Sequence, residues 1–129
     1  MKQLMNYLEV IRVIDVNKYF YDLRGRVTGL ELIPGRKFVS IYTDKEFTLT
    51  TKTQEKNGNI QYNHEIKAVG ELSERDVKRL NKSKVIIVIT DDKKNYYIGN
   101  VNLPATIILI PKLETCEINV SCSSLSPIF

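Results

Sequence analysis

The sequence predicts an α+β fold that is predominantly β, built as a mixed or antiparallel sheet or a sandwich-like barrel, with one short helix at about residues 73–82. Two observations predict this class. Short segments rich in β-branched and aromatic residues recur along the chain, with turn residues between them. One segment, by contrast, carries the start and stop signals of a helix. The length of 129 residues suits a single buried core, so we expect residues 1–129 to form one domain.

The N-terminal part is expected to form strands. Residues 8–16 are rich in Val and Ile, whose stiff side chains favour a strand, and apolar residues fall on both of its faces. A helix is the alternative, because Leu4, Leu8 and Ile11 have helical spacing. We prefer the strand, preceded by a tail at residues 1–6. Further along, residues 19–26 are aromatic and then turn-like, and strands are expected at residues 27–33 and 37–42 around a turn at Pro34-Gly35.

A long hairpin is expected next. Residues 46–53 alternate, with Phe47 and Leu49 on one face. Asn57-Gly58 accepts the positive φ angles of a tight hairpin turn at low cost. The strand after this turn has the clearest alternating row of the chain, which consists of Ile60, Tyr62, His64, Ile66 and Ala68.

The one convincing helix follows this hairpin. Ser73 is a good N-cap, because its hydroxyl can accept a hydrogen bond from a backbone N–H of the first turn. Asp76 lies three residues later, as in a capping box, and Leu72 and Val77 occupy the positions of a hydrophobic staple. The apolar face is narrow, so the helix is expected to be short and to lie on a sheet.

The C-terminal part returns to strands. Residues 85–90 are apolar without alternation, which indicates a strand buried on both faces. Residues 91–95 are charged and are expected to be a loop that leads to a hairpin partner at residues 96–98. Strands are also expected at residues 107–110, where Pro111 indicates an edge or a loop, and at residues 116–122.

No motif in the sequence carries catalysis, so we expect no catalytic, cofactor-binding or metal-binding residues and no enzymatic activity. His64 is the one histidine, and no motif supplies partners for a triad or a metal site, so we expect it to face solvent or a neighbouring strand. Asp91-Asp92 lacks the ligand spacing of a calcium loop and is expected to be a solvated hairpin tip. Cys116 and Cys122 would lie about 20 Å apart in a continuous strand, which predicts two free thiols.

Charge and hydropathy indicate which partners and which cellular compartment suit the protein. The net charge of +4 comes from Lys and Arg residues that are scattered among acidic residues, whereas a nucleic-acid footprint is usually clustered. The longest apolar runs are far shorter than the roughly 20 residues of a membrane span. No signal-peptide core follows the N-terminus, so the protein is expected to stay in the cytoplasm where it is made, away from membranes.

A nucleic-acid-binding module is the alternative hypothesis. Residues 35–40 half match an RNA-recognition motif, although that fold needs two helices and one is expected here. Aromatic rings near arginines can also stack bases and hold phosphates, but an aromatic edge of the core explains them more simply. The residues that would act in this way are Tyr19, Phe20, Tyr21, Arg24, Arg26 and Arg36.

The C-terminal half of the chain also carries a family resemblance. A hydrophobic strand precedes an acidic turn, a tyrosine-containing return strand ends at glycine, and a final hairpin closes the chain. In this order of features the chain resembles small virion proteins from the neck or tail gene cluster of tailed bacteriophages that infect Bacteroidetes. The resembling residues are 62–66, the helix around Leu80, residues 85–89, Asp91-Asp92, and residues 97–100, 103–105 and 126–129.

The resemblance implies a structural role. A protein of this kind would be a non-enzymatic neck or tail connector or tail component of the virion, made in the host cytoplasm. Its partners would be other virion proteins and copies of itself, assembled as a homo-oligomeric ring or tube close to the DNA path. Residues 1–7 and 123–129 would then be interaction tails that order on a neighbour, and frayed ends are the equally weighted alternative.

Overall fold

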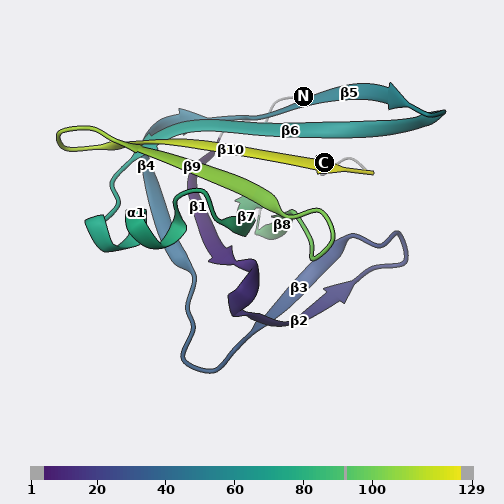
Figure 1. Cartoon of the computed structure of the whole chain (residues 1–129), viewed down its shortest axis with the longest axis horizontal. Coiled ribbons are helices and arrows are strands. Elements are labelled where there is room, and N and C mark those ends of the chain that lie inside the picture. The colour runs from purple at the N-terminus through teal and green to yellow at the C-terminus, as the bar shows by residue number, and fades with distance from the viewer. Residues whose placement is uncertain (1–4, 92, 126–129) are drawn as a thin grey trace.

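The computed structural model describes residues 5–91 and 93–125, and it confirms the predominantly β class with one short helix (Figure 1). All strand pairs among these residues are antiparallel. The eight-stranded sheet consists of β1 (Met5–Arg12), β4 (Val39–Phe47), β5 (Leu49–Lys56), β6 (Asn59–Gly70), β7 (Lys84–Asp91), β8 (Lys94–Ile98), β9 (Ala105–Pro111) and β10 (Cys116–Ser124). A separate two-stranded sheet contains β2 (Val16–Tyr21) and β3 (Val27–Leu32), and α1 spans Glu74–Leu80.

The large sheet closes on itself as a barrel. Its strand order is β1-β4-β6-β10-β9-β7-β8, and β1 also pairs with β7, so the first and the seventh strand of the chain meet. The inner face of this barrel holds the hydrophobic core, which includes Leu8, Ile41, Ile66, Ile107 and Ile118.

One seam of the barrel requires a glycine. The ladder between β4 and β6 consists of the pair Thr43 and Gly70. A Cβ atom on Gly70 would lie 2.9 Å from the backbone oxygen of Tyr42, closer than such atoms approach in proteins. Gly70 therefore allows the two strands to come together where the sheet turns its corner.

Strand β7 confirms the expectation of a strand buried on both faces. Val85, Ile87 and Ile89 belong to the barrel core. Ile86 and Val88 point the opposite way, as alternate residues of a strand do, and they are also buried. Burial on both sides explains why this segment has no polar position.

The long hairpin is also confirmed. Asn57 and Gly58 have φ angles of 52° and 80°, the two positive values that a tight two-residue turn requires. β5 and β6 pair in continuous register from Leu49 and Ile66 to Lys56 and Asn59. In Figure 1 the β5–β6 hairpin extends beyond the end of β10, and residues 50–56 are exposed on both faces of the ribbon.

Helix α1 begins as its capping signals predict. The Ser73 hydroxyl accepts a hydrogen bond of 3.1 Å from the backbone N–H of Asp76. Leu72 and Val77 pack against the core, and Leu80 is buried. After the helix, Asn81 Oδ1 accepts a hydrogen bond of 2.8 Å from the backbone N–H of Leu109, so the end of α1 covers the edge of β9 that faces it.

The prediction of one strand over residues 8–16 is wrong. The strand ends at Arg12, a 3₁₀ turn follows at Val13–Asp15, and β2 then leaves the barrel to pair with β3. Residues 19–21 accordingly belong to a strand, and the turn is confined to residues 22–26. The turn at Val13–Asp15 leaves Ile14 exposed and directs Asp15 inward.

Asp15 fixes this corner by electrostatics. Its carboxylate lies within ion-pair distance of Arg12 (3.1 Å), Arg36 (3.4 Å) and Arg79 (3.2 Å), which come from β1, the loop after β3 and α1. Burial alone would raise the pKa of the Asp15 carboxyl, but the hydrogen bonds and charges of Arg12 and Arg79 outweigh it and hold that pKa below its ordinary value. One carboxylate therefore joins three segments that are distant in the sequence.

The two proposed tails are in part strand. Met5 is buried and pairs with Phe47 in the barrel, so the expectation of a tail over residues 1–6 is wrong for residues 5 and 6. At the other end, Ser123 and Ser124 continue β10 and pair with β6. Residues 1–4 and 126–129 lie outside the described residues, as does Asp92 of the expected acidic hairpin tip.

Replacing Asp15 with Asn should destabilise the fold. Asp15→Asn keeps the size of the side chain but removes the charge that three arginines share, so we expect the free energy of unfolding to fall by about 1–3 kcal/mol. Urea denaturation followed by circular dichroism measures this change. Asp44→Asn, at an exposed position on β4, is the matched control, and we expect it to change stability by less than about 0.5 kcal/mol. Equal stability of the two variants would contradict the role of Asp15.

Candidate functional site

A cleft of about 710 Å³ lies between the β2–β3 hairpin and the β7–β8 hairpin. One wall is the β2–β3 turn, from Asp22 to Thr28, and the other is the β7–β8 hairpin with the loop that follows it. Residues 123–125 at the end of β10 complete its lining. We call this feature the hairpin cleft.

The β2–β3 wall is held in shape by Asp22. Its Oδ1 accepts hydrogen bonds of 2.9 Å from the backbone N–H groups of both Arg24 and Arg26, and its Oδ2 accepts one of 3.1 Å from the Arg26 side chain. These bonds hold the pKa of the Asp22 carboxyl below its ordinary value, and the bond from the Arg26 backbone has the largest effect on that pKa. Gly25 occupies the left-handed position in this turn, with a φ of 78°.

The opposite wall is also ordered by local bonds. Asn100 Oδ1 accepts hydrogen bonds of 2.8 Å from the backbone N–H groups of Asn102 and Leu103. The Lys94 ammonium lies 5.3 Å from the centre of the Tyr96 ring, a cation–π distance. Local hydrogen bonds thus fix the shape of both walls of the cleft.

The charge of the hairpin cleft is mostly positive. Among the described residues that line it, Arg24, Arg26, Lys93 and Lys94 are cationic and Asp22 is the one carboxylate. The sequence hypothesis included Arg24 and Arg26 but missed both lysines. Their position on a hairpin next to β3 follows from the tertiary fold, and no local pattern indicates it.

The six residues of the nucleic-acid hypothesis do not form one surface. The rings of Tyr19 and Tyr21 stack with centroids 6.2 Å apart on one face of the β2–β3 hairpin. Phe20 alternates to the other face, with Lys18 5.1 Å from its ring. Arg24 and Arg26 lie at the turn, whereas Arg36 is bound to Asp15 at the base of the hairpin. The structure therefore assigns the two turn arginines to the cleft and separates Arg36 from them.

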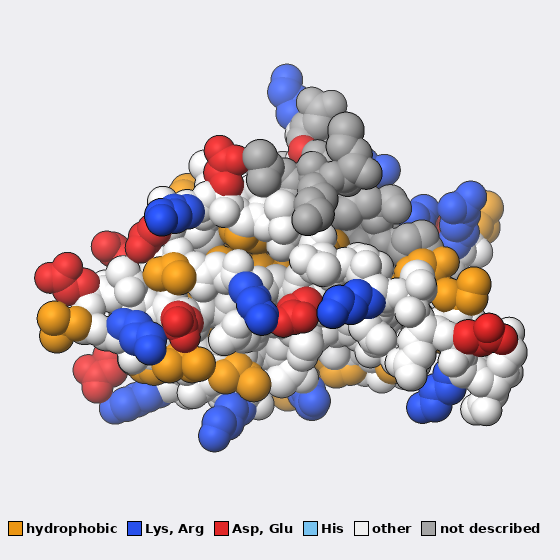
Figure 2. Space-filling model, turned by 90° about the horizontal axis from the view of Figure 1, so that it is seen from above, with side chains coloured by type: hydrophobic (Ala, Val, Ile, Leu, Met, Phe, Trp, Pro, Cys, Tyr) orange, Lys and Arg blue, Asp and Glu red, His pale blue; other side chains and the backbone are white. Residues whose placement is uncertain are grey.

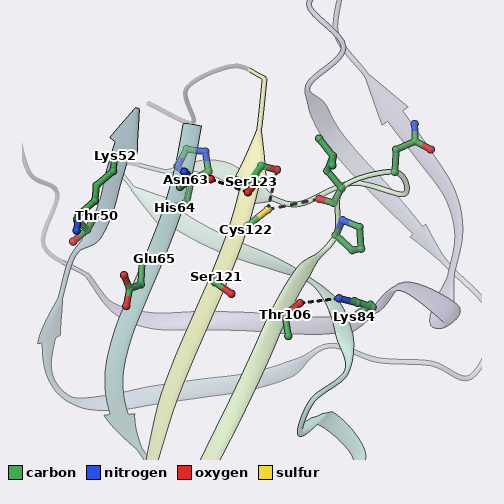
Figure 3. A pocket seen from close by; sticks show the side chains of 13 residues that line it. Thr50, Lys52, Asn63, His64, Glu65, Lys84, Thr106, Ser121, Cys122 and Ser123 are labelled. Atoms are coloured by element: carbon green, nitrogen blue, oxygen red, sulfur yellow. Dashed lines mark hydrogen bonds between the residues drawn. The ribbon is translucent and has the colours of Figure 1, made fainter. Parts of the chain in front are cut away.

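A second hollow, of about 570 Å³, lies over β5, β6, β10 and β9 (Figure 3). Its side chains are mainly polar, and several are bonded to each other: Ser123 donates a hydrogen bond of 2.8 Å to Asn63, and Lys84 donates one of 3.1 Å to Thr106. Seen from above, charged side chains of both signs and hydrophobic ones are interspersed over the molecule (Figure 2). Lys52 and Lys84 line this hollow together with Glu65, so it presents no uniform charge to a ligand.

His64 lies below this surface and is fixed by two neighbours. It is 2% exposed, its Nδ1 lies 2.9 Å from the Thr51 hydroxyl, and its Nε2 lies 2.6 Å from the Ser124 hydroxyl. In a catalytic triad the histidine lies between a nucleophilic serine and a carboxylate. His64 instead lies between two hydroxyls, those of Ser124 and Thr51. Burial lowers the pKa of His64, which keeps the ring neutral. We interpret His64 as a structural link between β5, β6 and β10, in agreement with the expectation that it faces a neighbouring strand.

The two cysteines are buried in β10 as free thiols. Burial raises the pKa of Cys122 to about 11, and it also raises the pKa of Cys116. A thiol with a raised pKa is a poor nucleophile at neutral pH. Across residues 5–91 and 93–125, no group of three or more His, Cys, Asp or Glu side chains has the arrangement to hold a metal ion.

Comparison of the chain with protein-family models, with curated proteins and with solved structures finds no match. Within the described part of the chain, no helix has the length and apolar character needed to cross a membrane.

The stability of the protein should depend on pH through His64. Because burial lowers the pKa of His64 in the folded protein, the unfolded chain binds this proton more readily. The contribution of neutral His64 to stability is therefore fully present above the unfolded-state pKa of about 6.5, and it is lost as the pH falls below that value. The slope for one proton is at most about 1.4 kcal/mol per pH unit. His64→Gln, which has no titrating group, should have a flatter dependence between about pH 7 and pH 5. Urea unfolding at a series of pH values measures the stability of the wild-type protein and of His64→Gln. Equal slopes of stability against pH for the two proteins would contradict the assignment of this pH dependence to His64.

Proposed function

We propose that this protein is a non-enzymatic structural subunit of a bacteriophage virion, a neck or tail connector or tail component, that assembles with copies of itself into a ring or tube. The observation that carries the proposal is the β5–β6 hairpin. Residues 50–56 are exposed on both faces although they form a regular strand. A two-stranded ribbon gains little stability by itself in water, so a long one suits contact with a neighbouring subunit.

The hairpin offers a surface for such contact. Among the described residues β5 pairs with β6 alone, so its other edge presents unpaired backbone N–H and C=O groups. An edge of this kind can add a strand from another chain, and the main-chain hydrogen bonds supply affinity. Lys52, Glu55 and Lys56 provide charges of both signs that would select a complementary partner and oppose random pairing.

Ile60 supplies an apolar contact on the same hairpin. Its side chain is 55% exposed, and it lies opposite Glu55 in the ladder. A hairpin on one subunit that binds a different surface on the next makes a heterologous interface, which closes as a ring when the rotation allows it. Ring or tube assembly needs one protruding element and one receiving surface, and the hairpin would supply the first.

The virion location rests on the sequence resemblance. The described residues that carry it lie in β6, α1, β7 and β8 and in the segment from residue 99 to Ala105. They are mainly elements of the barrel wall, which suits a scaffold without a reaction.

Shortening the hairpin tests the proposal. Deleting residues 53–56 together with 59–62 keeps the Asn57-Gly58 turn and places it between Lys52 and Asn63, which already pair in the ladder. We expect the shortened protein to keep its circular dichroism spectrum and to remain monomeric, whereas the full chain forms a defined oligomer. Size-exclusion chromatography with light scattering and negative-stain electron microscopy measure the difference.

Two point variants distinguish an effect of the hairpin on assembly from a general effect of replacing an exposed apolar side chain. We expect Ile60→Glu to raise the concentration needed for assembly by about tenfold or more, which corresponds to about 1.4 kcal/mol of interface energy. Leu23→Glu, at a fully exposed side chain on the β2–β3 turn, is the matched control and should assemble normally. A full-length protein that is monomeric at high concentration and missing from purified particles by mass spectrometry would overturn the proposal.

A further inference from the structure

The described side chains that line the hairpin cleft carry more positive than negative charge. Arg26 is balanced by Asp22, which lies 3.1 Å away, and Lys94 stands opposite Asp91 in the β7–β8 ladder. Among the described residues, Arg24 and Lys93 have no ion pair with a carboxylate. Both side chains are exposed and line the same cleft from opposite walls. Two cations without an ion pair among the described residues, both in the hairpin cleft, favour an anionic ligand there.

Local hydrogen bonds organise both walls of the cleft. Asp22 fixes the backbone that carries Arg24, and Asn100 fixes the loop after β8. A binding surface that is already ordered loses less conformational entropy on association. Lys93 has a φ of 66°, a left-handed conformation that sets the direction of its side chain at the β7–β8 turn.

Aromatic residues line the same cleft next to its cations. Tyr96 and Tyr97 belong to its lining beside Lys93 and Lys94, and Tyr96 also packs against the barrel core. Tyrosine rings and arginine planes stack on nucleic-acid bases, while lysine and arginine charges hold the phosphates. We propose that the hairpin cleft binds a single nucleic-acid strand through its phosphodiester backbone, with Arg24 and Lys93 as the principal phosphate ligands.

The shape of the cleft favours one strand over a duplex. A volume of about 710 Å³ falls within the range of about 300–1,000 Å³ that is typical of small-ligand sites, so the cleft can hold a few nucleotides. A duplex is usually bound by an element that enters its groove, whereas here two hairpins enclose a hollow. This inference goes beyond the assembly role, because it holds for a single subunit.

Fluorescence anisotropy with a labelled single-stranded oligonucleotide of about 15 nucleotides tests the inference. The test variant is Arg24→Ala with Lys93→Ala. The matched control is Lys37→Ala with Lys112→Ala, which removes the same charge from exposed positions outside the cleft lining. Circular dichroism verifies that both variants fold. Each titration is repeated over a series of salt concentrations, because phosphate contacts determine the salt dependence of binding.

We expect the wild-type protein and the control variant to bind alike, and the cleft variant to bind about tenfold more weakly. The slope of log affinity against log salt should become shallower in the cleft variant by about 0.7 for each lost phosphate contact. Absence of binding by the wild-type protein, or equal weakening in both variants, would overturn the inference. Inorganic triphosphate that binds as tightly as the oligonucleotide would show a site for small anions and would also overturn it. A duplex of the same sequence that binds more tightly would count against a single strand as the ligand.

Discussion

The pairing of β1 along both of its edges is the constraint on which the rest of the structure depends. β4 binds one edge and β7 the other, so the sheet closes and β7 acquires a neighbour on the side opposite β8. Closure hides the backbone groups of these strands from solvent and lets the apolar run of β7 be buried. Asp15 marks the point where the chain leaves the barrel, and three arginines hold it there.

Closure also determines where the protein can interact. Strands inside the barrel wall are paired on both sides, so the β5–β6 and β2–β3 hairpins, which extend from it, carry much of the exposed ribbon (Figure 1). The β5–β6 hairpin has a mainly polar surface with Ile60 exposed, and among the described residues β5 pairs with β6 alone, which suits contact with another subunit. The β2–β3 and β7–β8 hairpins line a cleft whose described charged side chains are mainly positive, which suits a phosphate-bearing strand. A subunit that surrounds DNA would use both properties, but each stands on its own observations.

The elements predicted correctly from the sequence are those with local signals. Asn57-Gly58 and the Ser73 cap act within a few residues, so their turn and helix follow from the sequence. The corner at Asp15 depends on Arg79, 64 residues away, and the chain was expected to continue as a strand because its Val and Ile pattern does not end there. The hairpin cleft depends on β3 packing beside β8, so Lys93 had no local signal as a site residue. Contacts between residues distant in the sequence create the corner at Asp15 and the hairpin cleft, so local sequence patterns did not predict them.

Hydrogen exchange at β5 tests the central claim, assembly through the hairpin, most directly. Because alternate N–H groups of an edge strand point away from its partner, half of the β5 amides lack a ladder bond in an isolated subunit. The account predicts that these amides exchange rapidly in the monomer and become protected in the assembled protein. Assembled particles in which the β5 amides exchange as fast as in the monomer would contradict it.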